Sequence, residues 1–372
     1  MTLYIGLMSG TSLDGIDAVL VDFSAETAAR PQALAHRHRP FEAGLRVELL
    51  ALNSAGSDEL HRAALAANAL ALAYAGAVAE LLTAAGVEPA QVRALGAHGQ
   101  TVRHRPREFD GHGYTLQLLN GALLAELSGI DTVCDFRSRD LAAGGIGAPL
   151  VPAFHAALFA QPGRAGAVLN LGGIANLSLL AADGAVSGFD CGPGNALMDG
   201  WCQRHTGAAY DDDGRWAASG RVDPDLLARL LVEPYFALPP PKSTGRDLFH
   251  RGWLDAALAS CTLPPATADV QATLAELTVS AAVDALLREG ADSSKLLVCG
   301  GGAYNGHLMR RLAERLPGVR VASTASKGVA PDQVEGLAFA WLARAFVERE
   351  PGNLPAVTGA RGPRVLGALH PK

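Results

Sequence analysis

The feature that most constrains the fold is a strand–glycine turn–strand unit that occurs once in each half of the chain. In the first copy, apolar residues 3–7 and 18–23 flank a turn rich in Gly, Ser, Thr and Asp. In the second copy, residues 167–171 and 177–180 flank a turn that begins with Gly172-Gly173. Each unit is typical of a β-hairpin, and its repetition within one chain indicates duplication. We therefore predict an α/β protein with two related halves.

The composition fits this prediction and excludes several functions. A chain of 372 residues, 49% hydrophobic, has enough interior for two domains with large cores. With a formal net charge of −6 and one short basic cluster at 104–107, nucleic acid is not expected as a partner. Five scattered cysteines without a Cys-x-x-Cys pair indicate thiols in a reducing compartment. We see no signal-peptide pattern and no apolar run of membrane-span length, so we expect a soluble cytoplasmic protein without a membrane partner.

The turn of the first hairpin, at residues 10–17, is long enough to wrap an anion. It is not a Walker loop, because no Gly-Lys-Ser/Thr ends it and no helix follows. The strand–turn–helix context of a dinucleotide-binding fingerprint is also absent. An ordinary β-turn that carries polar side chains explains this stretch equally well.

Polar residues follow two predicted strands of the first half. His98 and Gln100 come directly after residues 94–97, while Arg137 and Asp140 follow residues 132–136. Ligands of α/β sheets collect beyond the carboxyl ends of strands, and His with Gln suits a polyol. A structural histidine and a surface Arg–Asp pair are the alternatives.

In the second half, Asp190 is followed by Gly192, Pro193, Gly194 and Asn195. The glycines allow a ligand to approach the backbone, and the proline stiffens the turn. A carboxylate in this position suits a general base beside an anion pocket. An Asp that opens a surface turn is the alternative.

A third glycine turn follows the apolar residues 296–299. Gly300, Gly301 and Gly302 precede Asn305 and a predicted helix at 307–315, which together offer a flat surface for a base or a phosphate. Further along, Glu335 lies in the first turn of a helix that begins at Pro331. Alternatively, Glu335 only helps to cap the N-terminus of this helix.

Two long helices and two irregular segments complete the predicted organisation. Apolar periodicity predicts a helix at 57–86, with Leu60, Leu65, Leu72 and Leu81 among its apolar positions, and a second helix at 273–290. The glycine-rich segment 142–149 indicates a hinge or crossover. The proline-rich segment 239–247 predicts a loop over a cleft or on a domain face.

In this order, the two hairpin turns and the third glycine turn resemble the actin, sugar kinase and heat-shock chaperone superfamily. The resemblance implies a two-domain actin-like ATPase fold, made of duplicated ribonuclease H-like domains with a nucleotide cleft between them. We expect one domain at 1–150 plus about 351–372, and the other at 151–350.

Six stretches are similar, more narrowly, to the anhydro-N-acetylmuramic acid kinase family. They are residues 8–17, 98–101, 170–176, 190–195, 300–305 and 357–360. The resemblance implies an enzyme of peptidoglycan recycling that uses ATP and Mg²⁺. It would open the 1,6-anhydro ring with water and phosphorylate O6, giving N-acetylmuramate 6-phosphate and ADP. Asp190 would accept the proton of the water, and a homodimer is the usual assembly.

The resemblance also assigns binding residues. The implied ATP-binding residues come from the three glycine turns and the Asp190 turn and are Gly10, Thr11, Ser12, Leu13, Asp14, Gly15, Ile16, Asp17, Gly172, Gly173, Gly192, Gly194, Asn195, Gly300, Gly301, Gly302 and Asn305. The sugar-side candidates are His98, Gln100, Arg137, Asp140 and Glu335. The superfamily's Asp near the first strand end is replaced by Leu7-Met8, so Asp14, Asp17 or Asp190 would place the magnesium, through water. Cys191 stands where a small residue such as Thr is expected.

Two other functions remain open from the sequence. One is a conventional sugar kinase of the same fold that phosphorylates a free hydroxyl, which also needs Asp190 as a base. The other is an ATP-driven binding protein like the chaperones, for which we find no peptide-binding tail after residue 350.

Overall fold

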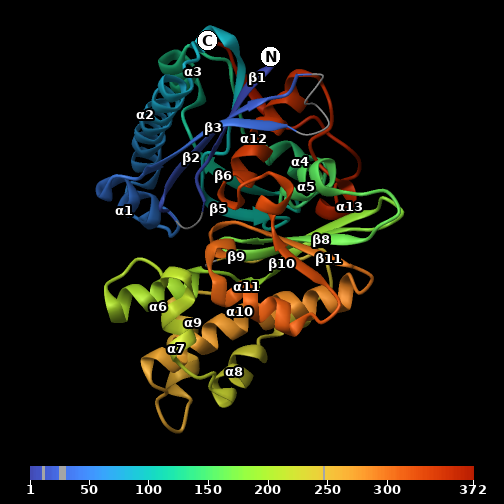
Figure 1. Cartoon of the computed structure of the whole chain (residues 1–372). Helices are drawn as coiled ribbons and strands as arrows, with labels where there is room; N and C mark the ends of the chain where they lie inside the picture. The colour runs from blue at the N-terminus through green and yellow to red at the C-terminus, as the bar shows by residue number, and fades with distance from the viewer. Residues whose placement is uncertain (11–12, 25–30, 246–247) are drawn as a thin grey trace. The chain divides into compact units, whose positions relative to one another are not determined.

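The computed structural model describes residues 1–10, 13–24, 31–245 and 248–372. The chain divides into two compact units, Met1–Leu158 with Asp332–Lys372 (unit 1) and Phe159–Pro331 (unit 2) (Figure 1). The second boundary differs from the expected one near residue 350. The reason is that helix α12 (Val334–Val347) packs against the first strand, β1 (Leu3–Met8), and so belongs to unit 1.

Unit 1 is built on a six-stranded sheet with the order β13-β7-β4-β1-β2-β3. Its strands after β1 are β2 (Gly15–Asp22), β3 (Gln32–Pro40), β4 (Val92–Ala97), β7 (Thr132–Cys134) and β13 (Ala368–His370). A separate two-stranded sheet holds β5 (Gln100–Pro106) and β6 (Gly113–Leu118). The other helices that begin in this unit are α1 (Ala43–Ala51), α2 (Glu59–Ala85), α3 (Gly121–Ser128), α4 (Ser138–Ala142), α5 (Val151–Phe159) and α13 (Pro355–Thr358).

Unit 2 is built on a five-stranded sheet with the order β10-β9-β8-β11-β12. The strands are β8 (Gly166–Leu171), β9 (Ile174–Leu180), β10 (Val186–Pro193), β11 (Lys295–Cys299) and β12 (Arg320–Ser323). The helices are α6 (Ala196–Thr206), α7 (Arg215–Ser219), α8 (Pro224–Leu231), α9 (Arg251–Ala259), α10 (Thr267–Glu289) and α11 (Gly306–Arg315).

The two units repeat one topology. In each, the first three strands form an antiparallel meander, β1-β2-β3 in unit 1 and β8-β9-β10 in unit 2. Two later strands then add in parallel on the other side of the first strand, β4 with β7 and β11 with β12. The prediction of an α/β fold with a duplicated domain is therefore confirmed.

Helix α12 lies very close to the sheet of unit 1, because glycines face it from two adjacent strands. A Cβ atom on Gly6 of β1 would lie 1.8 Å from the carbonyl oxygen of Gly336. A Cβ atom on Gly96 of β4 would lie 2.0 Å from the carbonyl oxygen of Phe339. Only glycine permits this approach, which sets the N-terminal turn of α12, with Glu335, beside the carboxyl ends of β1 and β4.

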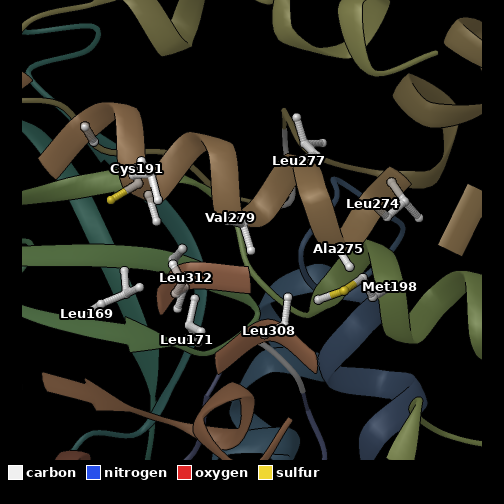
Figure 2. Close-up of a cluster of buried hydrophobic side chains, with 14 of the residues drawn as sticks. Leu169, Leu171, Cys191, Met198, Leu274, Ala275, Leu277, Val279, Leu308 and Leu312 are labelled. Atoms are coloured by element: carbon white, nitrogen blue, oxygen red, sulfur yellow. The ribbon is translucent and has the colours of Figure 1, made fainter. Parts of the chain in front are cut away.

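The core of unit 2 gathers around α10. Figure 2 shows Leu274, Leu277 and Val279 of this helix together with Leu171 of β8 and Leu308 of α11. These side chains are buried, so they fix α10 against the sheet at the end where β8 and β11 turn into their glycine segments.

Two helices correct the expectation that no apolar run reaches membrane-span length. Both α2 and α10 are long and apolar enough, with mean hydropathies of 1.6 and 1.3 over the most apolar 18 residues. In α10, 89% of these residues are buried, as in the core helix of a globular domain. In α2 only 44% are buried, and Leu60, Leu65 and Leu72 are exposed.

Candidate functional site

In unit 2, the second glycine turn and the Asp190 turn form one structure. The β9–β10 ladder pairs Asp190 with Asn176. Beyond it, the backbone N–H groups of Gly194 and Asn195 donate to the carbonyls of Gly173 (3.0 Å) and Gly172 (2.8 Å). A Cβ atom on Gly194 would lie 2.3 Å from the carbonyl oxygen of Gly172, so the two turns can meet only because this residue is glycine.

The third glycine turn reaches the same end of this sheet. Strand β11 runs parallel to β8 and pairs Cys299 with Asn170, so Gly300 follows directly beside the end of β8. The Asn195 side chain donates through Nδ2 to the carbonyl of Leu171 (2.9 Å) and lies beside Gly301 and Gly302. Three segments far apart in the sequence, at 172–173, 190–195 and 300–302, thus converge within unit 2.

Asn305 has a structural task at the end of the third turn. Its Oδ1 accepts from the backbone N–H of Leu308 at 3.0 Å, which caps α11. The side chain fixes the start of the helix immediately after the glycines.

Asp190 is held by a segment that the sequence did not connect with it. The side chain is 9% exposed, and its Oδ2 accepts from Ser243 Oγ (2.8 Å) and from the backbone N–H of Thr244 (3.0 Å). The Tyr235 hydroxyl donates to the backbone carbonyl of Asp190 at 2.8 Å. The proline-rich segment predicted as a loop over a cleft or on a domain face therefore packs on the candidate base, as far as the described residues show.

In unit 1, the end of β1 meets the His98–Gln100 turn and Arg137. Arg137 donates through Nη2 to Nε2 of His98 at 2.9 Å, so the imidazole proton sits on Nδ1, which faces the carbonyl of Ser9 at 3.2 Å. Gln100 donates through Nε2 to the carbonyl of Gly10 at 3.1 Å. These three candidates on the sugar side are therefore brought together with the start of the first turn.

The environment of His98 keeps it neutral. Burial, followed by the positive charge of Arg137, lowers the pKa of His98 to about 3. The ring also packs on Phe339 of α12, with ring centroids 4.9 Å apart. Neutral His98 is a weak base whose Nε2 already accepts from Arg137, and it fixes that guanidinium, whose Nη1 donates to the carbonyl of Gly147 at 2.8 Å.

Asp140 lies in the interior of unit 1 rather than at an open surface. Its side chain is completely buried, and its carboxylate accepts from Thr358 Oγ1 (2.8 Å), Asn353 Nδ2 (2.6 Å) and the backbone N–H of Gly147 (2.8 Å). The inward-facing side of α4 directs it towards the C-terminal segment. We therefore replace the expected substrate contact with an internal role that ties residues 353–358 to the glycine-rich segment.

The candidate carboxylates of the first turn have different surroundings. Asp14 is exposed, and its Oδ1 accepts from the backbone N–H of Gly15 at 3.0 Å. Asp17 Oδ1 faces His36 Nε2 (2.9 Å) and His38 Nδ1 (3.1 Å). Burial alone would raise the pKa of Asp17, but the hydrogen bonds from both histidines outweigh it and lower the pKa. Asp17 is thus engaged by imidazoles on β3, whereas the carboxylate of Asp14 is exposed.

Two apolar residues of the first turn can contribute little through their side chains. Leu13 and Ile16 are buried in the core of unit 1, so only their backbone is available to a phosphate. Thr11 and Ser12 lie outside the described residues. Within the described part of the chain, no group of three or more His, Cys, Asp or Glu side chains is arranged to hold a metal ion. The carboxylate of Asp14 is an oxygen donor of the kind that Mg²⁺ accepts.

Comparison with known proteins identifies relatives along the entire chain. The profile of the anhydro-N-acetylmuramic acid kinase family matches residues 2–372. A protein named anhydro-N-acetylmuramic acid kinase from Variovorax paradoxus is 64% identical over 375 residues, covering 99% of each chain. One of the same name from Cupriavidus pinatubonensis is 59% identical over 371 residues, covering 99% of this chain and 98% of the relative.

The fold is similar to that of a solved structure of distant sequence. Component A of the (R)-2-hydroxyglutaryl-CoA dehydratase from Acidaminococcus fermentans matches with a TM-score of 0.51 and 12% identity, over 91% of this chain and 96% of that chain. At this identity the likeness concerns the fold alone. Together with the duplicated topology, it agrees with the two-domain actin-like ATPase fold.

Proposed function

The chain belongs to the anhydro-N-acetylmuramic acid kinase family and is a kinase of that amino sugar; on this premise we propose how its residues perform the reaction. The enzyme opens the 1,6-anhydro ring with water and phosphorylates the released O6 with ATP. The products are N-acetylmuramate 6-phosphate and ADP.

Asp190 is the general base of this reaction. It accepts a proton from the water that attacks the anomeric carbon, while the bond from that carbon to the bridging oxygen breaks. The freed O6 then attacks the γ-phosphorus in line, and ADP leaves. One base is enough, because the leaving oxygen of the ring opening is the nucleophile of the phosphoryl transfer. Base catalysis of this kind contributes about 10²- to 10⁴-fold.

The observation that carries the proposal is the position of Asp190 in unit 2. It is a buried carboxylate, held by Ser243 and Thr244, at the start of the turn that packs on Gly172 and Gly173. Glycine turns of this kind bind phosphates through backbone N–H groups. A base beside such a turn suits a nucleophile that attacks a phosphorus atom.

The three glycine turns bind ATP, with separate tasks. We assign Gly172 and Gly173 to the phosphates, together with the first turn from Gly10. The N–H groups of Gly194 and Asn195 already donate to carbonyls within the site, so these residues shape the phosphate turn. Gly300, Gly301 and Gly302 receive the adenosine.

In this proposal Asp14 would supply a carboxylate to hold Mg²⁺. When bound, Mg²⁺ would offset the negative charge of the phosphates. On the sugar side we assign His98, Gln100, Arg137 and Glu335. The guanidinium of Arg137, fixed by His98 and Gly147, suits the carboxylate of a muramic acid.

The test of the proposed base is Asp190→Asn, which keeps the shape of the side chain. We expect kcat to fall by about 10²- to 10⁴-fold while the affinity for a non-hydrolysable ATP analogue stays unchanged. Asp183→Asn is the matched control, since Asp183 is an exposed carboxylate in the turn between β9 and β10. Turnover by Asp190→Asn within about tenfold of the wild type would exclude Asp190 as the base.

We also place the enzyme in the cytoplasm as a homodimer. The five cysteines are widely spaced in the sequence and include no Cys-x-x-Cys pair, which supports a reducing compartment. The exposed Leu65 and Leu72 lie on one face of α2 and support a self-association surface, because exposed apolar side chains on one face favour association. Light scattering should give a dimer for the wild type and a monomer for Leu72→Glu; a wild-type monomer contradicts the assembly.

A further inference from the structure

We propose that Ser243 is a positioning residue for catalysis, and that Tyr235–Thr244 (the 235–244 segment) is built to hold Asp190 in one orientation. This inference rests on the proposed role of Asp190 as the base. It adds a residue, and a segment, that neither the glycine motifs nor the family match assigns to the reaction.

The carboxylate of Asp190 is oriented by two donors on the same oxygen. Ser243 Oγ lies 2.8 Å from Oδ2, and the backbone N–H of Thr244 lies 3.0 Å from it. Two donors converging on one oxygen fix the rotation of the carboxylate about its own axis. Of the two, only the Ser243 hydroxyl belongs to a side chain and can be removed by substitution.

The backbone of Asp190 is fastened by the same segment. Strand β10 is an edge of the unit 2 sheet, and its register shifts between Asp190 and Gly192. An edge strand leaves peptide groups without a neighbouring strand. Here the Tyr235 hydroxyl donates to the Asp190 carbonyl (2.8 Å), and the Asp190 N–H donates to the carbonyl of Lys242 (3.3 Å). The 235–244 segment therefore covers this edge at the position of the base.

Lys242, near the end of the 235–244 segment, bonds to the residues at its start. Its ammonium group, on a side chain that is 6% exposed, donates to the carbonyls of Tyr235 (3.1 Å) and Phe236 (3.3 Å). It also lies 4.7 Å from the centre of the Tyr235 ring. Burying a lysine is unfavourable unless its donors are satisfied. In this arrangement the lysine links both ends of the segment, next to Ser243.

These contacts predict an effect on the chemical step rather than on binding. A misplaced base slows turnover without weakening the affinity for either substrate, because positioning to within an ångström is worth about 100-fold in rate. A purely structural role for Ser243 would instead alter stability and leave kcat unchanged.

The experiment measures kcat and both KM values for Ser243→Ala, Ser243→Thr and the full-length wild type. We expect Ser243→Ala to lower kcat roughly 10- to 100-fold with KM values within about twofold, and Ser243→Thr, which keeps the hydroxyl, to restore most of the rate. Ser219→Ala, in α7 of the same unit, is the control and should retain full activity. Ser243 is half-buried, so we expect the Ala variant to fold, and thermal unfolding checks this. Ser243→Cys is a second variant: its thiol is a weaker donor than the hydroxyl, so we expect an intermediate kcat.

Two outcomes would overturn the inference. One is a Ser243→Ala enzyme with the wild-type kcat; the other is a loss that appears only in KM or that Ser243→Thr does not reverse. Failure of the proposed function gives a different result, since Asp190→Asn would then keep its turnover. An enzyme in which Asp190→Asn is inactive and Ser243→Ala fully active keeps the base and rejects the positioning role.

Discussion

Replacing Asp140 by Asn tests whether this residue holds the structure together or contacts the sugar. In the wild type, one carboxylate oxygen accepts from Thr358 and Asn353, and the other accepts from the N–H of Gly147. An amide has only one acceptor oxygen, so its NH2 group must face at least one of these donors. Losing one charge-assisted hydrogen bond inside the protein costs about 1.5–3 kcal/mol, and weakening the others adds to it. We expect the free energy of unfolding of unit 1 to fall by roughly 2–4 kcal/mol.

Urea unfolding, followed by circular dichroism, measures this change through the midpoint of the transition that reports on unit 1. The variant should also show a raised KM for the sugar, because Gly147 accepts from the Arg137 guanidinium. Asp135→Asn, an exposed carboxylate at the end of β7, is the control. A variant with wild-type stability and a raised KM would refute the internal role and restore Asp140 as a substrate contact.

Three further predictions concern stability and reactivity. Gly96→Ala should destabilise unit 1 by more than about 3 kcal/mol or prevent folding, since its Cβ would lie 2.0 Å from a carbonyl of α12; Gly44→Ala, with no atom within 4 Å, should be neutral or stabilising by urea titration. Burial lowers the pKa of His155 to about 3. Between about pH 6.5 and pH 3 the unfolded chain therefore binds a proton at this residue that the native state does not bind, so the free energy of unfolding falls as the pH drops through this range. His155→Leu should reduce that slope by about 1.4 kcal/mol per pH unit, and an unchanged slope contradicts the burial argument. Titration of the folded protein with a thiol reagent should modify Cys261 alone, because the other four cysteines are buried. Burial also raises the pKa of Cys191, so rapid labelling of Cys191 would contradict this prediction.

Local patterns were sufficient to predict the hairpins, the long helices and the duplicated topology. The strand–glycine turn–strand units and the 3.6-residue periodicity are short-range signals. The membership of α12 in unit 1 was not predictable in the same way. It depends on Gly6 and Gly96, far apart in the sequence, both facing one helix across the sheet. The periodicity of α2 also did not reveal that Leu60, Leu65 and Leu72 are exposed, since an Ala- and Leu-rich helix is apolar on every side.

In the candidate site, too, short-range motifs were predictable from the sequence and contacts between distant residues were not. The glycine turns were recognisable because each motif is contiguous, and the sheet of unit 2 brings three of them together. Ser243 and Lys242 were missed as partners of Asp190, because a contact between residues some fifty positions apart, with three helices between them, leaves no periodic signal. Asp140 was predicted as a sugar contact because its position after a strand does not show that the side chain of this short helix turns inward.

The central claim, ring opening by water with phosphorylation of the released oxygen, is tested most directly with isotope-labelled water. The enzyme is incubated with ATP, Mg²⁺ and 1,6-anhydro-N-acetylmuramic acid in H₂¹⁸O, and the product is analysed by mass spectrometry before the reducing end exchanges with solvent. We predict N-acetylmuramate 6-phosphate with one ¹⁸O at C1 and none in the phosphate, and no such product from Asp190→Asn. A phosphorylated sugar that retains the anhydro ring and carries no label would contradict the mechanism and indicate a conventional sugar kinase.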